Sequence, residues 1–142
     1  MLPNKRLASY QSVAVATASP GKLILMLYDG ALRFLGAAED GFRLEGLRER
    51  QEAVHNNLIK AQNIISELQR CLSVRDGGDF AINLFRLYDF MNTRLMEANV
   101  RKEPENIRVV ARLLGEVRDA WDQMLREQAA SACPAASASL SA

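Results

Sequence analysis

Apolar residues recur along most of the chain at intervals of three and four positions. This spacing places them on one face of an α-helix, whereas a half-buried strand would alternate apolar and polar residues. The pattern is interrupted by glycines after residue 40, by the string RDGGD and by the string RKEPEN, which are typical helix ends and starts. Four helices are therefore predicted: one over about 20–44, one over about 47–72, one carrying the apolar residues of 80–98, and one opening at Pro104.

Four helices of this length joined by short turns predict an all-α fold, an antiparallel four-helix bundle over residues 19–127. The preceding segment, residues 1–18, contains apolar side chains such as Leu7 and Tyr10. We expect it to pack on the surface of the bundle. After Glu127 the chain reads QAASACPAASASLSA, which has little to bury, so residues 128–142 are predicted to be a disordered tail.

Each helix has a main apolar stripe that is predicted to face the core. These stripes are Leu23, Met26, Leu27, Ala31, Phe34, Leu35 and Ala38 on the first helix; Val54, Leu58, Ala61, Ile65, Leu68 and Leu72 on the second; Phe80, Leu84, Leu87, Tyr88, Met91, Leu95 and Ala98 on the third; and Ile107, Val110, Leu113, Leu114, Val117, Trp121, Met124 and Leu125 on the fourth.

Further apolar residues lie beside these stripes. They are Ile24, Tyr28 and Leu32 on the first helix, Ile64 on the second, and Ile82, Phe85, Met96 and Val100 on the third. Such a wide apolar arc is either additional core or a groove that accepts apolar helices from a partner. Periodicity leaves both interpretations open.

Composition excludes several classes of protein. The 18 basic and 17 acidic residues leave a net charge of +1, which argues against nucleic-acid binding. No apolar run approaches the roughly 18 residues that span a bilayer, and polar residues interrupt the start of the chain where a signal peptide would be apolar. We therefore expect a cytoplasmic protein without an integral membrane segment. Cys71 and Cys133 match no metal or redox spacing and are expected to be free thiols.

Candidates for catalysis are few. His55 is the only histidine, so triads and multi-histidine metal sites lack ligands, and neither a metal nor a cofactor is predicted. A di-iron bundle would need a second Glu-x-x-His pair beside Glu52 and His55. A histidine phosphotransfer bundle using His55 is retained as an alternative function. Three aspartates follow aromatic residues and are interpreted as polar positions that are solvated or bonded to a neighbouring helix: Asp29, Asp89 and Asp122.

Four strings in series resemble the flagellar secretion chaperone family FliS. They are SPGKLILMLYDGALRFLGAA, NNLIKAQNIISELQRCL, GGDFAINLFRLYDFMNTRLMEANV and RVVARLLGEVRDAWDQM. The similarity extends over nearly all of residues 7–125. It implies a non-enzymatic cytoplasmic bundle that binds the C-terminal segment of flagellin, prevents premature polymerisation and delivers it to the export gate of the flagellar type III apparatus.

The resemblance also implies that the N-terminal segment lies over part of the cargo surface, where Tyr10 matches an aromatic position of the family and Leu7 stands one turn before it. For the surface itself the stripes suggest Ile24, Tyr28, Ile64, Ile82, Phe85, Met96 and Val100. A generic bundle that self-associates through its spare stripes, for example as a homodimer, stays open as a further alternative.

Overall fold

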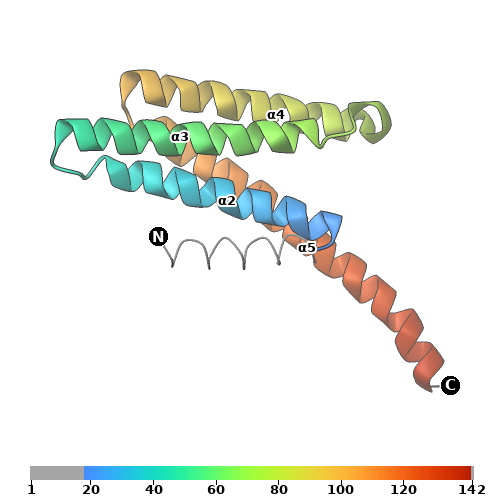
Figure 1. Cartoon of the computed structure of the whole chain (residues 1–142). Helices are drawn as coiled ribbons and strands as arrows, with labels where there is room; N and C mark the ends of the chain where they lie inside the picture. The colour runs from blue at the N-terminus through green and yellow to red at the C-terminus, as the bar shows by residue number, and fades with distance from the viewer. Residues whose placement is uncertain (1–17, 142) are drawn as a thin grey trace.

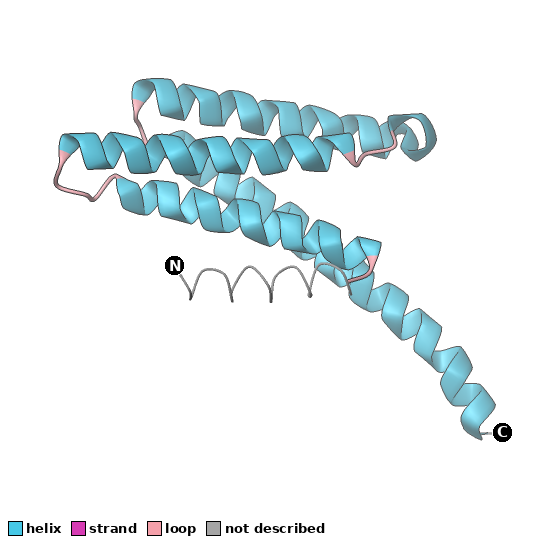
Figure 2. Ribbon diagram, viewed as in Figure 1, coloured by secondary structure: helices cyan, strands magenta, loops and turns pink. Residues whose placement is uncertain are grey.

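The computed structural model of the chain describes residues 18–141, and these residues form four α-helices and no strand (Figure 1, Figure 2). The helices are α2 (Pro20–Gly41), α3 (Leu47–Arg70), α4 (Val74–Arg101) and α5 (Glu105–Ser141). Each packs beside the next along the chain, and α5 returns to lie beside α2. The predicted all-α antiparallel bundle is thus confirmed, whereas the position expected for the N-terminal segment concerns residues 1–17, which lie outside the described residues.

Local signals explain where the helices begin and break. The Ser19 hydroxyl accepts a hydrogen bond from the backbone N–H of Lys22 at 3.2 Å, and Pro20 occupies the first helical position. In α4 the first turn is followed by a break at Gly78, whose φ of 61° favours glycine. The RDGGD string therefore contains the predicted interruption, although its first residues belong to a helical turn that begins at Val74.

The core is a continuous cluster of buried side chains from all four helices. On α3 the first five of the six residues in the predicted stripe are buried as expected, and Leu72 is partly buried. On α2 the prediction was wrong in part, because Leu25 and Tyr28 are buried whereas Leu27 and Phe34 are only partly buried against the core. The centre of the α2 stripe thus runs through Tyr28, because this helix packs against both α3 and α5 and needs an arc wider than one seam.

Two similar strings, LYDG in α2 and LYDF in α4, meet across the core. The hydroxyls of Tyr28 and Tyr88 share a hydrogen bond of 2.5 Å in the buried interior. Asp29 accepts a hydrogen bond from Arg118 of α5 at 2.8 Å, and Asp89 accepts one from Gln69 of α3 at 2.9 Å. These aspartates are therefore bonded to neighbouring helices, as predicted. Asp122 forms ion pairs within its own helix.

Helix α5 continues beyond the end of the bundle to Ser141 (Figure 1). The sequence interpretation ended the bundle near Glu127 and expected residues 128–142 to be a disordered tail, and that expectation stays a prediction. Alanine has the highest intrinsic helix propensity, so an alanine-rich segment can prolong a helix that is already nucleated. None of the described helices is long and apolar enough to cross a membrane.

Two glycines of α2 should respond in opposite ways to replacement by alanine. A Cβ at Gly36 would contact nothing within 4 Å, whereas one at Gly41 would lie 3.1 Å from Ala53 Cβ and 3.3 Å from the Val54 backbone nitrogen. We expect Gly36→Ala to stabilise the fold by about 0.5–1 kcal/mol through helix propensity. Overpacking of about 1–3 kcal/mol should make Gly41→Ala neutral or destabilising. Urea unfolding checks both, and equal stabilisation by the two substitutions would contradict the close approach of α2 and α3.

Candidate binding groove

An apolar groove lies between the first half of α4 and the middle of α5. Its volume is about 370 Å³, and Tyr28 of α2 contributes to its lining. The lining residues from α4 are Phe80, Asn83, Leu84 and Leu87, and those from α5 are Val117, Ala120, Trp121 and Met124. Figure 1 shows why this side is open, since α5 passes behind the bundle and diverges from α4 toward its C-terminal end.

Polar contacts hold the middle of α5 to α2 rather than to α4. The indole Nε1 of Trp121 donates to the carbonyl oxygen of Gly21 at 2.9 Å. One helical turn earlier, Arg118 forms an ion pair with Asp29 at 2.8 Å. Helix α4 is bonded to α3 by side-chain hydrogen bonds from Gln62 and Gln69. The α4–α5 side is therefore left uncovered where the two helices diverge.

The chemistry of the groove is that of an apolar contact surface. Asn83 is the only lining residue with an amide side chain. The lining of the groove contains no carboxylate, lysine, arginine or histidine. The Tyr28 hydroxyl is engaged by Tyr88, and burial raises the pKa of Tyr28, so this group is neutral at physiological pH. No nucleophile or base lies among the lining residues. The groove can bind apolar side chains, and it offers no groups for catalysis.

The residues that the sequence suggested for binding are placed in different surroundings. Leu7 and Tyr10 lie outside the described residues. Ile24 and Ile64 are partly buried against the core, Ile82 is half-buried, and Tyr28 is 2% exposed. Phe85, Met96 and Val100 are exposed by 38%, 55% and 79%. Of the suggested residues that the structure describes, Tyr28 lines the groove, whereas the exposed three share α4 and do not line it.

Most groove residues were instead assigned to the core by the sequence. Phe80 was placed in the core stripe of its helix, which is wrong, because it is 73% exposed. Met124 was assigned in the same way and is 36% exposed. The physical reason is the divergence of α5 from α4, which removes the neighbour that would cover these side chains. The sequence did contain a usable signal. Phe80 lies near the start of its predicted helix and Met124 near the end of the next one, and in an antiparallel bundle these two ends meet, where side chains have fewer neighbours to cover them.

Comparison with known proteins decides the family. The model of the family described as "Flagellar protein FliS" matches residues 3–128. The chain belongs to the FliS family. It is 34% identical over 120 residues to the flagellar secretion chaperone FliS of Bacillus subtilis (strain 168), covering 84% of this chain and 86% of that protein. It is 40% identical over 112 residues to FliS of Salmonella typhimurium, covering 78% and 80%, and 35% identical over 128 residues to FliSB of Pseudomonas aeruginosa, covering 86% and 97%.

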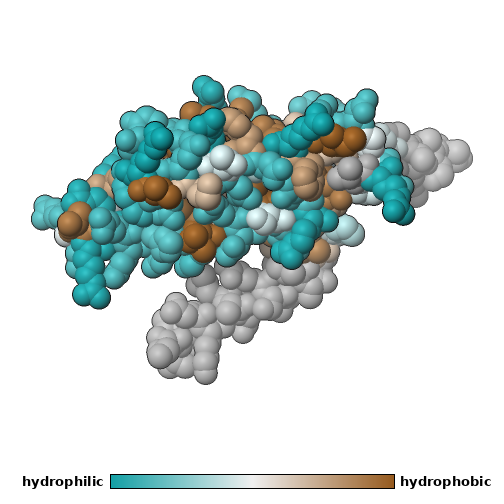
Figure 3. Space-filling view, turned by 90° about the horizontal axis from the view of Figure 1, so that it is seen from above, coloured by the Kyte–Doolittle hydropathy of each residue, from teal (hydrophilic) through white to brown (hydrophobic). Residues whose placement is uncertain are grey.

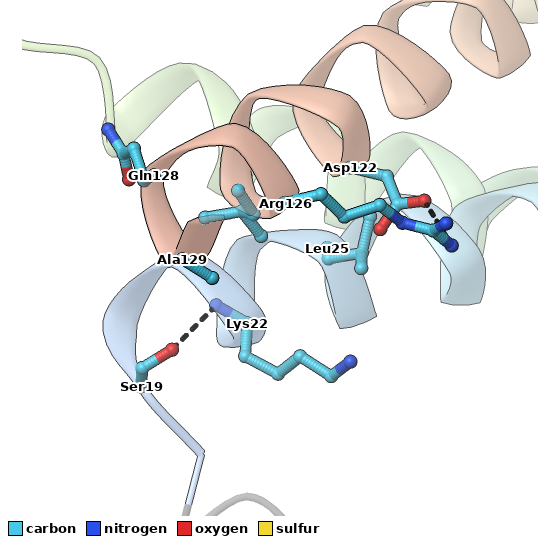
Figure 4. A pocket seen from close by; sticks show the side chains of 8 residues that line it. Ser19, Lys22, Leu25, Asp122, Arg126, Gln128 and Ala129 are labelled. Atoms are coloured by element: carbon cyan, nitrogen blue, oxygen red, sulfur yellow. Dashed lines mark hydrogen bonds and ion pairs between the residues drawn. The ribbon is translucent and has the colours of Figure 1, made fainter. Parts of the chain in front are cut away.

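This FliS-family chain has a second, more polar cavity of about 510 Å³ where α2 begins and α5 leaves the bundle (Figure 4). Lys22 and Leu25 line it from α2, and Asp122 and Arg126 line it from α5. The carboxylate of Asp122 forms an ion pair with Arg126 at 3.2 Å, so the two opposite charges on the α5 side neutralise each other. Its polar lining distinguishes this cavity from the apolar groove.

The FliS-family bundle also exposes apolar side chains outside the groove. The face seen from above in Figure 3 carries separate hydrophobic patches among hydrophilic side chains. Helix α4 contributes Phe85, Phe90, Met96 and Val100 to the exposed apolar residues of the described chain. His55 is exposed on α3 and its Nδ1 lies 2.9 Å from the Asn99 amide nitrogen, which is an ordinary surface contact.

Proposed function

We propose that this chain is a cytoplasmic export chaperone that binds the C-terminal segment of flagellin, with the α4–α5 groove as a principal contact surface. The observation that carries the proposal is the groove itself, an apolar cavity of about 370 Å³ in a chain whose relatives are named flagellar secretion chaperones. A mostly apolar concavity of this volume lies within the range of about 300–1,000 Å³ that is typical of binding sites.

The shape and chemistry of the groove suit an amphipathic helix. Two helices form its sides, so a third can place apolar residues at positions i, i+3, i+4 and i+7 between them. Binding of this kind covers the apolar face of the cargo, which would otherwise be free to associate with other flagellin molecules. Ordering a disordered segment costs about 2–5 kcal/mol or more of the interaction energy, which keeps release feasible.

A flagellin segment long enough to contact more than one helix would also reach the outer side of α4. Phe85, Met96 and Val100 are exposed there, and their exposure supports a second contact surface that is separate from the groove. Ile64 and Ile82 would lie at its edge as half-buried neighbours. The complex then delivers the cargo to the export gate of the flagellar type III apparatus. This function uses no cofactor and involves no catalysis.

The experiment that tests the proposal is a calorimetric titration of a flagellin C-terminal peptide into the full chain and into a chain lacking residues 1–17. The full chain should bind saturably with one site. Because Leu7 and Tyr10 are proposed to occupy surface that cargo also uses, the deletion should change the affinity. Absence of binding to both chains would remove the proposal, and equal affinities would remove the role of the N-terminal segment.

Light scattering on the same samples separates a chaperone from a bundle that self-associates through its apolar surfaces. The chaperone should give a 1:1 complex with the peptide. A stable homodimer whose mass does not change when peptide is added would favour the self-association alternative instead.

A further inference from the structure

A small pocket with an unusual charge content lies at the end of the bundle opposite the groove. It is formed where α2 turns into α3 and where α4 ends, and its volume is about 170 Å³. Phe42, Leu47 and Val54 give it apolar walls, and Arg50 and Lys102 add two cations. The remaining lining residue is Gln51, so the lining contains no carboxylate.

Arg50 is the first sign that the pocket has an anionic ligand. Its Nε is buried and has no hydrogen-bond partner among the described residues. Nearby arginines are paired, since Arg43 lies 3.9 Å from Asp40 and Arg48 lies 3.1 Å from Glu52. A buried, unpaired guanidinium nitrogen is unfavourable unless a ligand supplies an acceptor.

Lys102 is the second sign, because its backbone is in a conformation that suits glycine. With φ 53° and ψ 51° it ends α4 in the left-handed region, where glycine or asparagine is usual. Its ammonium donates to Asn99 Oδ1, a neutral acceptor that is itself held by His55. Neither Lys102 nor Arg50 forms an ion pair with any described carboxylate. Burial lowers the pKa of Lys102, which agrees with a partly desolvated cation that lacks a counter-charge.

We propose that the pocket of Arg50 and Lys102 binds the C-terminal carboxylate of a polypeptide whose last side chain is apolar. A terminal carboxylate and the last side chain share one Cα, so a single residue can satisfy the two cations and the apolar walls together. The volume is close to that of a cavity of about 150 Å³ that holds benzene, which suits one such side chain.

Other anions fit the pocket less well. An aspartate or glutamate within a chain would bring a carboxylate without an apolar group on the same residue, and its backbone would have to continue in both directions. A phosphate would leave Phe42, Leu47 and Val54 facing a strongly hydrated group. The proposal rests on the proposed function only for the identity of the polypeptide, which would be flagellin; the ligand chemistry rests on the pocket.

The direct test uses a short probe and the full chain. Acetyl-Leu-Leu with a free carboxylate and the same dipeptide as its amide are titrated while the methyl NMR signals of Leu47 and Val54 are recorded. The acid should shift both signals saturably, and the amide should bind at least tenfold more weakly. Equal shifts with the two probes, or no shift with either, would overturn the proposal.

Replacing Lys102 by glycine separates binding from folding. Because glycine adopts the left-handed conformation without strain, Lys102→Gly should unfold at the same or a higher urea concentration than the parent chain. Its affinity for the acid should fall about ten- to a hundredfold, the range of a charge-assisted hydrogen bond, while Lys102→Arg should retain most of it. The matched control is Lys22→Ala, which removes one positive charge at the other end of the bundle and should leave the affinity unchanged. Unchanged affinity in Lys102→Gly would overturn the proposal.

The natural cargo gives a second measurement. A flagellin C-terminal peptide with its free carboxylate should bind at least tenfold more tightly than its C-terminal amide. Equal binding of the two forms would overturn the proposal while the proposed chaperone function stands. If neither form binds, the proposed function fails, and the dipeptide titration still decides the pocket.

Discussion

Replacing Phe80 and Met124 together by serine should weaken binding of the flagellin C-terminal peptide by about a hundredfold. These side chains lie at the two sides of the groove and are exposed in the free protein. Each would be covered by cargo, and covering a phenylalanine or methionine side chain contributes about 1.5–3 kcal/mol. Scaled to the 73% and 36% of these side chains that are exposed, the two losses together come to about 2–3 kcal/mol, which corresponds to about two orders of magnitude in the dissociation constant. Calorimetry measures the affinity.

The matched control is Phe90→Ser on the same helix. Phe90 is 40% exposed and stacks under the guanidinium of Arg94, with 5.0 Å between the guanidinium carbon and the ring centroid, and it does not line the groove. The Phe90→Ser substitution should reduce the affinity for the flagellin peptide by less than threefold. Both proteins should keep their urea midpoints, because partly exposed residues contribute little to the core. A groove variant that binds like the parent chain would show that cargo docks elsewhere, and Phe85→Ser with Met96→Ser then tests the outer side of α4.

Raising the pH from 8 to 11 should cost the fold about 1.4 kcal/mol through Tyr88, with a further loss through its partner Tyr28. Burial and the hydrogen bond between the two residues raise the pKa of Tyr88, and burial also raises that of Tyr28. In the unfolded chain both hydroxyls titrate near pH 10. Below that pH both states hold the protons and no stability is lost. Above it the unfolded state releases them while the folded state retains the Tyr88 proton, so Tyr88 costs about 1.4 kcal/mol per pH unit. The raised pKa of Tyr28 adds a loss in the same direction.

The double variant Tyr28→Phe with Tyr88→Phe isolates this effect. Urea unfolding at pH 8, 10 and 11 should show that the double variant loses at least about 1.4 kcal/mol less than the parent chain between pH 8 and pH 11, since every other titrating group is common to both. At pH 8 each single variant should lose about 1–3 kcal/mol, because one hydroxyl stays buried without its partner. At the same pH, the double variant should lose less unfolding free energy than the sum of the losses of the two single variants. Parallel pH curves for parent and double variant would contradict the buried pair.

The candidate site could be predicted from the sequence only in part. Periodicity found the apolar residues of the groove, yet it assigned Phe80 and Met124 to the core. It selected Phe85 and Met96 as surplus, and they are exposed, but on another side of α4. A helical pattern states which residues share a face. It does not state which neighbouring helix covers that face, or over what length.

The pocket of Arg50 and Lys102 had no signal in the sequence at all. Its residues come from the end of α2 and the start of α3, which are consecutive, and from the end of α4, which is about fifty positions further along the chain. The left-handed backbone of Lys102 could not be anticipated, because a lysine at that position gives no indication of φ. Charge totals were also uninformative, since a balanced chain can still hold two cations together without a carboxylate.

Local signals in the sequence account for the helices, the breaks between them and most of the buried stripe, because spacing, capping and helix-breaking residues act over a few positions. The α3 core and the break at Gly78 follow from such local rules. Which apolar residues stay uncovered depends instead on how the helices pack together. Trp121 and Arg118 bond α5 to α2, and this draws α5 away from α4 and leaves the groove between them. Contacts between residues about a hundred positions apart have no periodicity, so they become visible only when the helices are assembled.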